Sequence, residues 1–307
     1  MAQIELLSEE DAPLLAVRIA EQLGRHAQDN PFISPTFDVG QLTEALRQAR
    51  AETLVAVEDG RIIGHLYGAY LTNDLHGAGV WVGPDGASFD SGEILTDLYL
   101  RADERWRARG GFDQYVWTLD DAATSAAWLA LGFTRAHQRG VLSLNAPRDV
   151  SLPAGYGVRR ALPTDIEACL VLDQVIDEAN EQITHAGAND ADNQRAELLD
   201  SLEDPEVHFY VVEHEGNIVA QCMTYPLLTR RGSFDQTLHL SSVATLPNHQ
   251  RRGLATAVVN TALTNAFLAG FEYCETNWRV TNERASTHWL KYGFHSTYVR
   301  LHRRTTA

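Results

Sequence analysis

Residues 248–259 read NHQRRGLATAVV and combine two adjacent arginines, a glycine and an immediate change to good helix formers. The apolar run before them, LHLSSVATL at 238–246, has the composition of a strand, and Pro247 ends it. The start of a helix presents unpaired backbone N–H groups and a partial positive charge, so it favours an anion. Gly253 lets the backbone approach such a ligand closely. The stretch therefore predicts a strand, an anion-binding turn and a helix, with phosphate or pyrophosphate as the anion.

The helix predicted after this turn carries a continuous apolar face. Leu254, Val258, Ala262 and Ala266 recur every four residues, the spacing of a helix that packs on a core. Gly270 follows as the expected C′ residue, where a left-handed backbone conformation ends many helices. The sequence thus predicts a long helix buried along one side.

The chain contains an internal repeat. Residues 110–133 and 269–294 both begin with Gly-Phe, continue through an apolar segment and an Ala-rich helix pattern, and end in Trp-Leu-x-x-Gly-Phe. Residues 54–70 and 209–225 each place two β-rich runs around an acidic residue and a glycine, the pattern of a β-hairpin. Two copies of one structural unit are therefore predicted.

The join between the copies lies near residue 150, in a Pro- and Gly-bearing segment. We expect a first domain at 1–147, a linker at 148–155 and a second domain at 156–307. The order of strands and helices in each half predicts an α/β fold of the α+β type. Each copy is expected to contain a mixed, largely antiparallel sheet flanked by helices.

Composition narrows the class of protein. The 307 residues carry a formal net charge of −16, which argues against a nucleic-acid partner or an anionic membrane surface and suits a cationic amine. No apolar run approaches the roughly 20 residues of a membrane helix. Cys169, Cys222 and Cys274 lie apart in apolar stretches without metal-ligand spacing, so we expect buried reduced thiols, no metal and a cytoplasmic location.

Two motifs resemble those of the GNAT (Gcn5-related N-acetyltransferase) superfamily. The run Gln250-Arg251-Arg252-Gly253-Leu254-Ala255 is similar to the family's coenzyme motif, Gln/Arg-x-x-Gly-x-Gly/Ala. The later Asn282-x-x-Ala285-x-x-x-Trp289-x-x-x-Gly293-Phe294 is similar to its closing helix, in which a Tyr usually stands where this chain has Trp289. Both motifs fall in the second half, so the chain resembles a tandem GNAT protein with one intact copy.

The resemblance implies acetyl-CoA as cosubstrate and a set of residues that bind it. The backbone amides of residues 251–255 would hold the coenzyme pyrophosphate, and either arginine could add a charge-assisted hydrogen bond. The resemblance places Asn282 and Trp289 near the coenzyme. A backbone N–H of Ser242, Val243 or Ala244, on the preceding strand, would meet the thioester carbonyl oxygen.

Catalysis in the family requires a proton acceptor for the amine and a proton for the departing thiolate. An indole N–H cannot supply that proton at working pH, so Trp289 is interpreted as a packing residue, like Trp128 in the first half. Tyr292, with His288 as a relay, is the candidate acid, and water is the alternative. Glu275 and His239, the polar residues in two strand-like runs, are the candidate bases, although either could face solvent.

The first half lacks the coenzyme motif. Its corresponding stretch at 80–100 starts a helix near Asp90 and Glu93, which are expected to cap that helix and repel a pyrophosphate. We therefore interpret the first half as a degenerate copy. The sequence predicts an N-acetyltransferase acting on a primary amine of a small molecule or peptide. A non-catalytic acyl-CoA-binding regulator is the alternative, and the oligomeric state, with a homodimer as one possibility, is left open.

Overall fold

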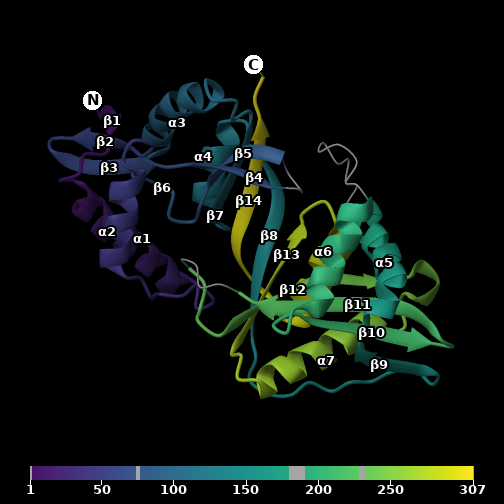
Figure 1. Ribbon diagram of the computed structural model, residues 1–307. Helices are drawn as coiled ribbons and strands as arrows, with labels where there is room; N and C mark the ends of the chain where they lie inside the picture. The colour runs from purple at the N-terminus through teal and green to yellow at the C-terminus, as the bar shows by residue number, and fades with distance from the viewer. Residues whose placement is uncertain (1, 74–76, 180–190, 228–231, 307) are drawn as a thin grey trace. The chain divides into compact units, whose positions relative to one another are not determined.

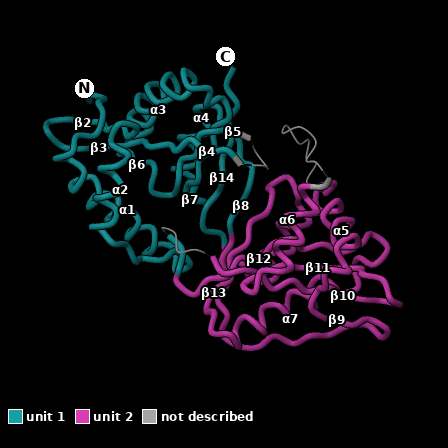
Figure 2. Tube along the Cα trace, in the orientation of Figure 1, with its two compact units in different colours: residues 1–139, 230–234, 296–307 teal, residues 140–229, 235–295 magenta. Residues whose placement is uncertain are grey.

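The computed structural model describes residues 2–73, 77–179, 191–227 and 232–306 of the chain. The chain forms two compact units, shown in Figure 2. Unit 1 comprises residues 1–139, 230–234 and 296–307, and unit 2 comprises residues 140–229 and 235–295. Both are mixtures of helices and sheet, so the predicted α+β class is confirmed.

Unit 1 is built mainly from the first half of the chain. Its elements are β1 (Gln3–Leu6), α1 (Ala12–Asp29), α2 (Val39–Ala49), β2 (Leu54–Glu58), β3 (Arg61–Leu66), β4 (Ala69–Asn73), β5 (Gly77–Val82), β6 (Ala87–Phe89), α3 (Gly92–Arg107), β7 (Asp113–Leu119), α4 (Ala122–Ala130) and β8 (Thr134–Ser143). Strands β1, β2, β3 and β6 form an antiparallel four-stranded sheet. A second sheet places β5 parallel to β7.

Unit 2 holds most of the second half. Its elements are β9 (Tyr156–Arg160), a 3-10 turn (Pro163–Asp165), α5 (Ile166–Ala179), α6 (Ala191–Glu203), β10 (His208–His214), β11 (Asn217–Pro226), β12 (Thr237–Thr245), a 3-10 turn (Pro247–His249), α7 (Leu254–Leu268), β13 (Tyr273–Arg279) and α8 (Glu283–Tyr292). The final strand, β14 (His295–Arg304), belongs to unit 1 from residue 296 on, and β8 belongs to unit 2 from residue 140 on. The strands lie in the order β13, β12, β11, β10, β9, antiparallel except for the parallel pair β12 and β13.

Helices cover both faces of the unit 2 sheet. Figure 1 shows α5 and α6 on one side of β10, β11 and β12 and α7 on the other. The predicted α7 stripe is buried in a core that includes Leu238 and Leu240 of β12 and Cys222 of β11. A second core under α5 contains Cys169, Phe209 and Val211. Side chains that alternate along β12 therefore face either the α7 core or α5.

The two predicted hairpins are present and share their turn geometry. Asp59 and Gly60 join β2 to β3 with φ of 50° and 73°, and Glu215 and Gly216 join β10 to β11 with φ of 50° and 78°. Positive φ at both central residues is the signature of the turn that matches the twist of a two-residue hairpin. The matching turns support the interpretation of an internal repeat.

The last strand of each copy joins the sheet that the other copy begins. Strand β14, at the end of the chain, pairs antiparallel with β7 of the first half. Strand β8 runs beside β13 of the second half, and the Leu144 amide just after it donates to the Glu272 carbonyl at 2.8 Å. The compact units therefore do not coincide with the predicted domains 1–147 and 156–307. The boundary at 148–155 stays a prediction about where the sequence repeats join.

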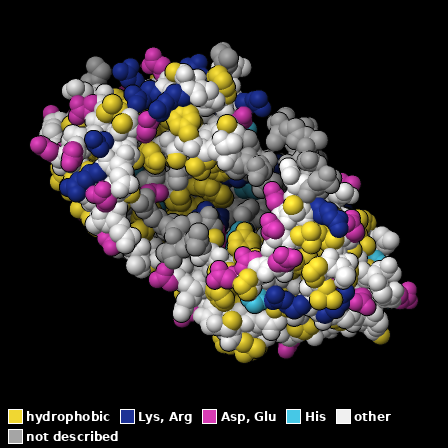
Figure 3. Space-filling model, viewed as in Figure 1, with side chains coloured by type: hydrophobic (Ala, Val, Ile, Leu, Met, Phe, Trp, Pro, Cys, Tyr) yellow, Lys and Arg dark blue, Asp and Glu magenta, His cyan; other side chains and the backbone are white. Residues whose placement is uncertain are grey.

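Within the described part of the chain, no helix is long and apolar enough to cross a membrane. On the face seen in Figure 3, acidic and basic side chains are interspersed over each unit. Cys169, Cys222 and Cys274 are all buried free thiols, and burial raises the pKa of each. This matches the cysteine state that the sequence predicted.

Candidate active site

The turn before α7 has the geometry of an anion cradle. Gly253 adopts φ 80° at the N-cap of α7, and the preceding Arg251 has φ 60°, so two of three consecutive residues are left-handed. No side chain caps α7 in the described structure, which leaves the backbone donors of its first turn available. A methyl group added at Gly253 would meet no atom of the described residues within 4 Å, so the space in front of the backbone is open there.

The side chains of the motif hold the turn in place. The Gln250 amide donates to the Thr245 carbonyl at 3.1 Å, tying the turn to the end of β12. Arg252 donates to the Tyr156 hydroxyl at 2.8 Å and to the Asn248 carbonyl at 3.2 Å. The Arg251 side chain is exposed. An open turn with available backbone donors and an exposed Arg251 guanidinium beside it fits a pyrophosphate group.

Strands β12 and β13 separate next to this turn. Their parallel pairing covers three residue pairs and ends at His239 opposite Glu275. Just beyond, the Thr276 hydroxyl donates to the Leu240 carbonyl at 2.9 Å. The pairing does not continue beyond this point, so among the described residues the backbone of β12 after Leu240 is not paired with β13.

A β-bulge marks the diverging part of β12. Gln221 of β11 faces Ala244, whereas Met223 faces Ser241, so Ser242 and Val243 together lie opposite one residue of β11. Ser242 has φ 48°, an uncommon conformation for a non-glycine residue. Bulges redirect backbone and side-chain groups. The segment where the sequence predicted a donor to the carbonyl oxygen is therefore locally irregular.

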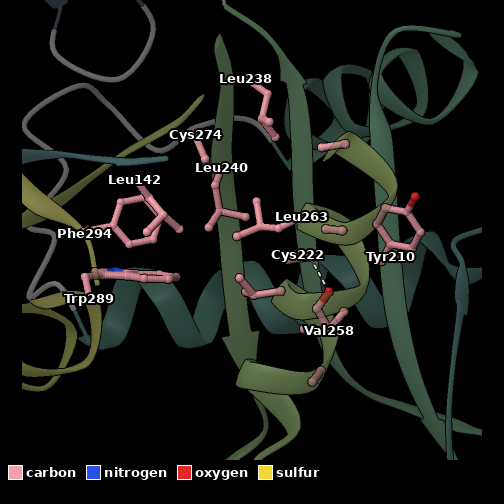
Figure 4. Packing of buried hydrophobic residues seen from close by; sticks show 14 of the residues in the cluster. Leu142, Tyr210, Cys222, Leu238, Leu240, Val258, Leu263, Cys274, Trp289 and Phe294 are labelled. Carbon is pink, nitrogen blue, oxygen red and sulfur yellow. Dashed lines mark hydrogen bonds between the residues drawn. The ribbon is translucent and has the colours of Figure 1, made fainter. Parts of the chain in front are cut away.

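Asn282 precedes α8, and Trp289 lies in its second half. Asn282 caps the helix, since its side-chain oxygen accepts from the Ala285 amide at 3.0 Å. Figure 4 shows the Trp289 indole beside Phe294 and Leu142 in the α7 core. The Trp289 and Phe294 rings meet edge to face at 5.4 Å and 80°.

The first copy repeats this aromatic contact. Trp128 is fully buried and meets Phe133 at 5.1 Å and 78°. The same geometry in both halves supports the interpretation of each Trp as a packing residue.

Tyr292 is the last residue of α8, and its side chain reaches α7. Its hydroxyl donates to the Asn260 side chain, and the Arg148 guanidinium lies 4.9 Å from its ring centre. Burial raises the pKa of this phenol, and burial lowers the pKa of the neighbouring His288. Cys274 on the α7 face of the sheet is among the groups near the phenol. The role of Tyr292 as an acid stays a prediction.

His239 and Glu275, the predicted bases, lie opposite each other at the last strand pair. They are 7% and 1% exposed, so neither faces solvent. Leu238 and Leu240, on either side of His239, point into the α7 core, and Cys274 beside Glu275 does the same. By alternation both predicted bases face away from α7 and from Tyr292. The structure brings the two bases together and does not bring the predicted acid to them.

One polar group near the bulge was missed from the sequence. Asp173 on α5 accepts a hydrogen bond from the Gln221 side chain at 2.8 Å and another from the Ser242 side chain. Burial, together with the charge of Asp177, raises the pKa of Asp173 to about 6. The only sequence signal was the spacing of Asp173 and Asp177, four residues apart on one helix face. This spacing did not predict the residues of β11 and β12 that Asp173 contacts.

Unit 1 differs at the corresponding helix start, and one expectation needs correction. Asp90 does not cap α3: Ser91 does, accepting from the Ile94 amide at 3.4 Å. Asp90 instead pairs with Arg18 of α1 at 2.7 Å. Ser91 caps the helix because its short side chain at the N-cap position reaches the amide of Ile94, the third helical residue. Asp90 lies one residue before that position. A cavity of about 200 Å³ next to it is lined by residues of α1 and β7, including Arg25 and Trp117.

Comparison with known proteins agrees with the motifs. Residues 172–294 match the model of the acetyltransferase (GNAT) family. The structure is similar to a GCN5-related N-acetyltransferase from Sphaerobacter thermophilus, with a TM-score of 0.63, 17% identity, and coverage of 100% of this chain and 97% of that chain. It is also similar to a tandem GNAT protein from the clavulanic acid biosynthesis pathway, with a TM-score of 0.55, 16% identity, and coverage of 100% and 99%.

At these identities the solved structures show the shared fold, and no curated protein matches the chain. The family match spans α7, the diverging strands β12 and β13, and α8, which carry both sequence motifs. Residues 172–294 therefore form a domain of the acetyltransferase (GNAT) family.

Proposed function

We propose that the chain is an acyl-CoA-dependent N-acetyltransferase that moves an acetyl group from acetyl-CoA to a primary amine of a small molecule or peptide, with its active site in unit 2. The observation that carries the proposal is the uncapped start of α7. Gly253 and Arg251 are both left-handed there, and no atom would obstruct a group placed at Gly253. Unit 1 lacks this geometry, because Ser91 caps its helix.

The residues around the turn before α7 would have different roles in binding the coenzyme. Backbone amides at 251–255 would hold the pyrophosphate, and the exposed Arg251 guanidinium would add a charge-assisted contact. Gln250 and Arg252 keep the turn in shape through bonds to Thr245 and Tyr156. Asn282 caps the start of α8, and its side chain would contact the coenzyme. Trp289, which packs in the core of unit 2, would support the coenzyme site from beneath.

The diverging strands would accommodate the reacting end. Backbone N–H groups of Val243 and Ala244, at and after the bulge, are the candidate donors to the thioester carbonyl oxygen. Such donors accelerate acyl transfer because they are already oriented where negative charge develops. His239 and Glu275 remain candidate proton acceptors, and Tyr292 or water remains the candidate proton donor.

The alternative, a non-catalytic acyl-CoA-binding regulator, is favoured by one observation. The usual Tyr of the closing helix is replaced by Trp289, which packs in the core, and the nearest Tyr donates its hydroxyl to Asn260. The regulator and the enzyme both bind the coenzyme. Only the enzyme releases free thiol when an amine is added.

The test is acetyl-CoA-dependent release of free thiol with ethanolamine, spermidine, tyramine, glucosamine and a peptide with a free N-terminal alanine. We expect release with at least one of these amines and none with the matched alcohol or N-acetylated form. Gly253→Asp should abolish release, because it places a carboxylate in the anion site. Gly270→Asp is the matched control: Gly270 is also left-handed, at φ 94°, with no atom near its added side chain, at the other end of α7.

Coenzyme binding without thiol release from any amine would favour the regulator. Equal release from the Gly253→Asp and Gly270→Asp variants would contradict the assignment of the site to this turn.

A further inference from the structure

Helix α5 directs two carboxylates toward the region where β12 and β13 separate. Asp173 is bonded to Ser242 at the bulge of β12. Asp177 lies one turn farther along α5, and the positive charge of Arg279 on β13 lowers its pKa against the effect of burial. One carboxylate of α5 is thus associated with each diverging strand. They lie on the α5 side of the sheet, the side that His239 and Glu275 also face.

The Gln221 side chain can form a hydrogen bond with Asp173 in both of its protonation states. Gln221 is 0% exposed, and its side-chain N–H donates to Asp173 at 2.8 Å. Its carbonyl oxygen is buried with no hydrogen-bond partner in the described structure. Rotation of the amide by half a turn would present that oxygen to a protonated Asp173, since an amide offers donors on one side and an acceptor on the other. Asp173 therefore has a partner in both protonation states.

The surroundings of Asp173 move its pKa from the ordinary carboxyl range toward neutral pH. Burial is the main cause that raises its pKa to about 6, and the negative charge of Asp177 adds to it. Burial also raises the pKa of Asp177, against the charge of Arg279. Cys169 on α5 is a further titratable neighbour, and burial raises the pKa of its thiol to about 12. From the sheet, Gln221 and Ser242 contribute hydrogen bonds, and His239 of β12 and Glu275 of β13 are the ionisable groups that face the same side.

The corresponding helix of unit 1, α1, contributes basic rather than acidic side chains at this place. Around the cavity beside Asp90, α1 contributes Arg18, Arg25 and His26. Burial lowers the pKa of His26, so that ring is biased toward its neutral form. The acidic residues of α5 are therefore not a shared requirement of the fold. They distinguish the copy that has the open coenzyme turn.

We propose that Asp173 takes the proton from the acceptor, and that the acceptor is a primary amine that arrives as an ammonium ion on the α5 side of β12. The inference rests on the acyltransferase function proposed above and names its acceptor class and its base. A buried carboxylate without a cationic partner loses solvation free energy, so it favours a cationic ligand. It becomes neutral once it accepts a proton from that ligand.

The proton and electron balance is complete. The Asp173 carboxylate takes one proton from the ammonium group, and the freed nitrogen lone pair forms a bond to the thioester carbonyl carbon. The C–S bond breaks, and its electron pair leaves with sulfur. Nitrogen gives a second proton to the sulfur, directly or through water, and Asp173 releases its own proton to solvent. The products are the N-acetylated amine, the free thiol of the coenzyme and one proton.

The test compares wild type with Asp173→Asn and Glu178→Gln, using acetyl-CoA and whichever of the five amines gives the fastest thiol release. Glu178 is an exposed carboxylate on the same helix and serves as the control. Asp173→Asn should lower kcat/KM by about 10²–10⁴-fold, the usual worth of general acid–base catalysis. The wild-type decline of kcat/KM below about pH 6 should vanish in Asp173→Asn and persist in Glu178→Gln.

A second measurement does not depend on turnover. The pKa of Asp173 is raised in the folded state, so its stabilising effect is complete below about pH 4 and is lost as pH rises through about 6. The melting temperature of Asp173→Asn relative to wild type should therefore rise between pH 4 and pH 7. The increase in melting temperature caused by coenzyme A should be the same in both proteins.

The outcomes separate the two proposals. No thiol release by wild type with any amine would overturn the acyltransferase function and this inference with it. If wild type is active, a loss below about threefold in Asp173→Asn would overturn this inference alone. The inference is also overturned if Glu275→Gln or His239→Asn, rather than Asp173→Asn, removes the decline below pH 6, or if the relative melting temperature does not change with pH.

Discussion

At the scale of single residues, the sequence predicted Gly253 of the candidate site but neither the conformation of Arg251 nor the role of Asp173. Gly253 was predicted because a glycine at a helix start has a clear use, and it adopts φ 80°. The left-handed Arg251 could not be predicted, since that conformation is unfavourable for an ordinary residue and depends on the surrounding turn. Asp173 was missed because its meaning comes from Gln221, 48 positions away in sequence.

The missing closing-helix tyrosine can be tested by removing single polar atoms. Trp289→Phe keeps an aromatic ring next to Phe294 but removes the indole N–H and part of the ring volume, so stability should fall while turnover falls by less than about tenfold. If water supplies the proton, Tyr292→Phe should change turnover little and, through loss of the hydrogen bond to Asn260, should lower stability by about 1 kcal/mol. Steady-state kinetics and thermal melting of both variants measure these effects.

Two results would change the assignment of roles. A loss of about 10²–10⁴-fold in Tyr292→Phe, with unchanged coenzyme affinity, would identify Tyr292 as the general acid. A loss of that size in Trp289→Phe alone would mean that the indole N–H takes part in the chemistry.

At the scale of elements, local sequence predicted most of the pieces correctly. The α7 stripe, the end of α7 before Gly270, and both hairpins follow from periodicity and turn chemistry, which act over a few residues. The start of α3 was placed correctly near residue 92, but its cap was assigned to Asp90 and Glu93 instead of Ser91. Neighbouring polar residues compete for one cap, and small shifts in backbone direction decide which one reaches it.

The caps of the two closing helices provide a matched pair of variants. Asn282 caps α8 and Asp121 caps α4, each accepting from the amide three residues on, at 3.0 and 2.8 Å. Each change to Ala should lower stability by about 1 kcal/mol, through loss of one capping bond. Only Asn282→Ala should also weaken coenzyme A binding, by about tenfold, because α8 belongs to the copy with the open turn. Thermal melting and calorimetric titration measure the two effects.

If Asn282→Ala and Asp121→Ala bind coenzyme A with equal affinity, Asn282 serves only as a cap. If Asp121→Ala weakens binding instead, the assignment of the coenzyme to unit 2 is contradicted.

At the scale of the whole molecule, the repeat was visible in the sequence and the exchange of last strands was not. Pairs such as Trp128 with Phe133 and Trp289 with Phe294 recur at fixed spacing, which reveals two copies. Strands β8 and β14 come from equivalent positions, and backbone hydrogen bonds do not depend on side-chain identity. Either strand could therefore complete either sheet, and the choice depends on contacts far apart in sequence.

The most direct test is the increase in melting temperature of the full-length protein caused by coenzyme A. A ligand at 100 times its dissociation constant should stabilise the folded state by about 2.7 kcal/mol. Wild type, Gly270→Asp and Gly92→Asp should all show the increase, and Gly253→Asp should show none. An increase that survives in Gly253→Asp, or one that is lost in Gly92→Asp, would contradict a coenzyme site at the start of α7.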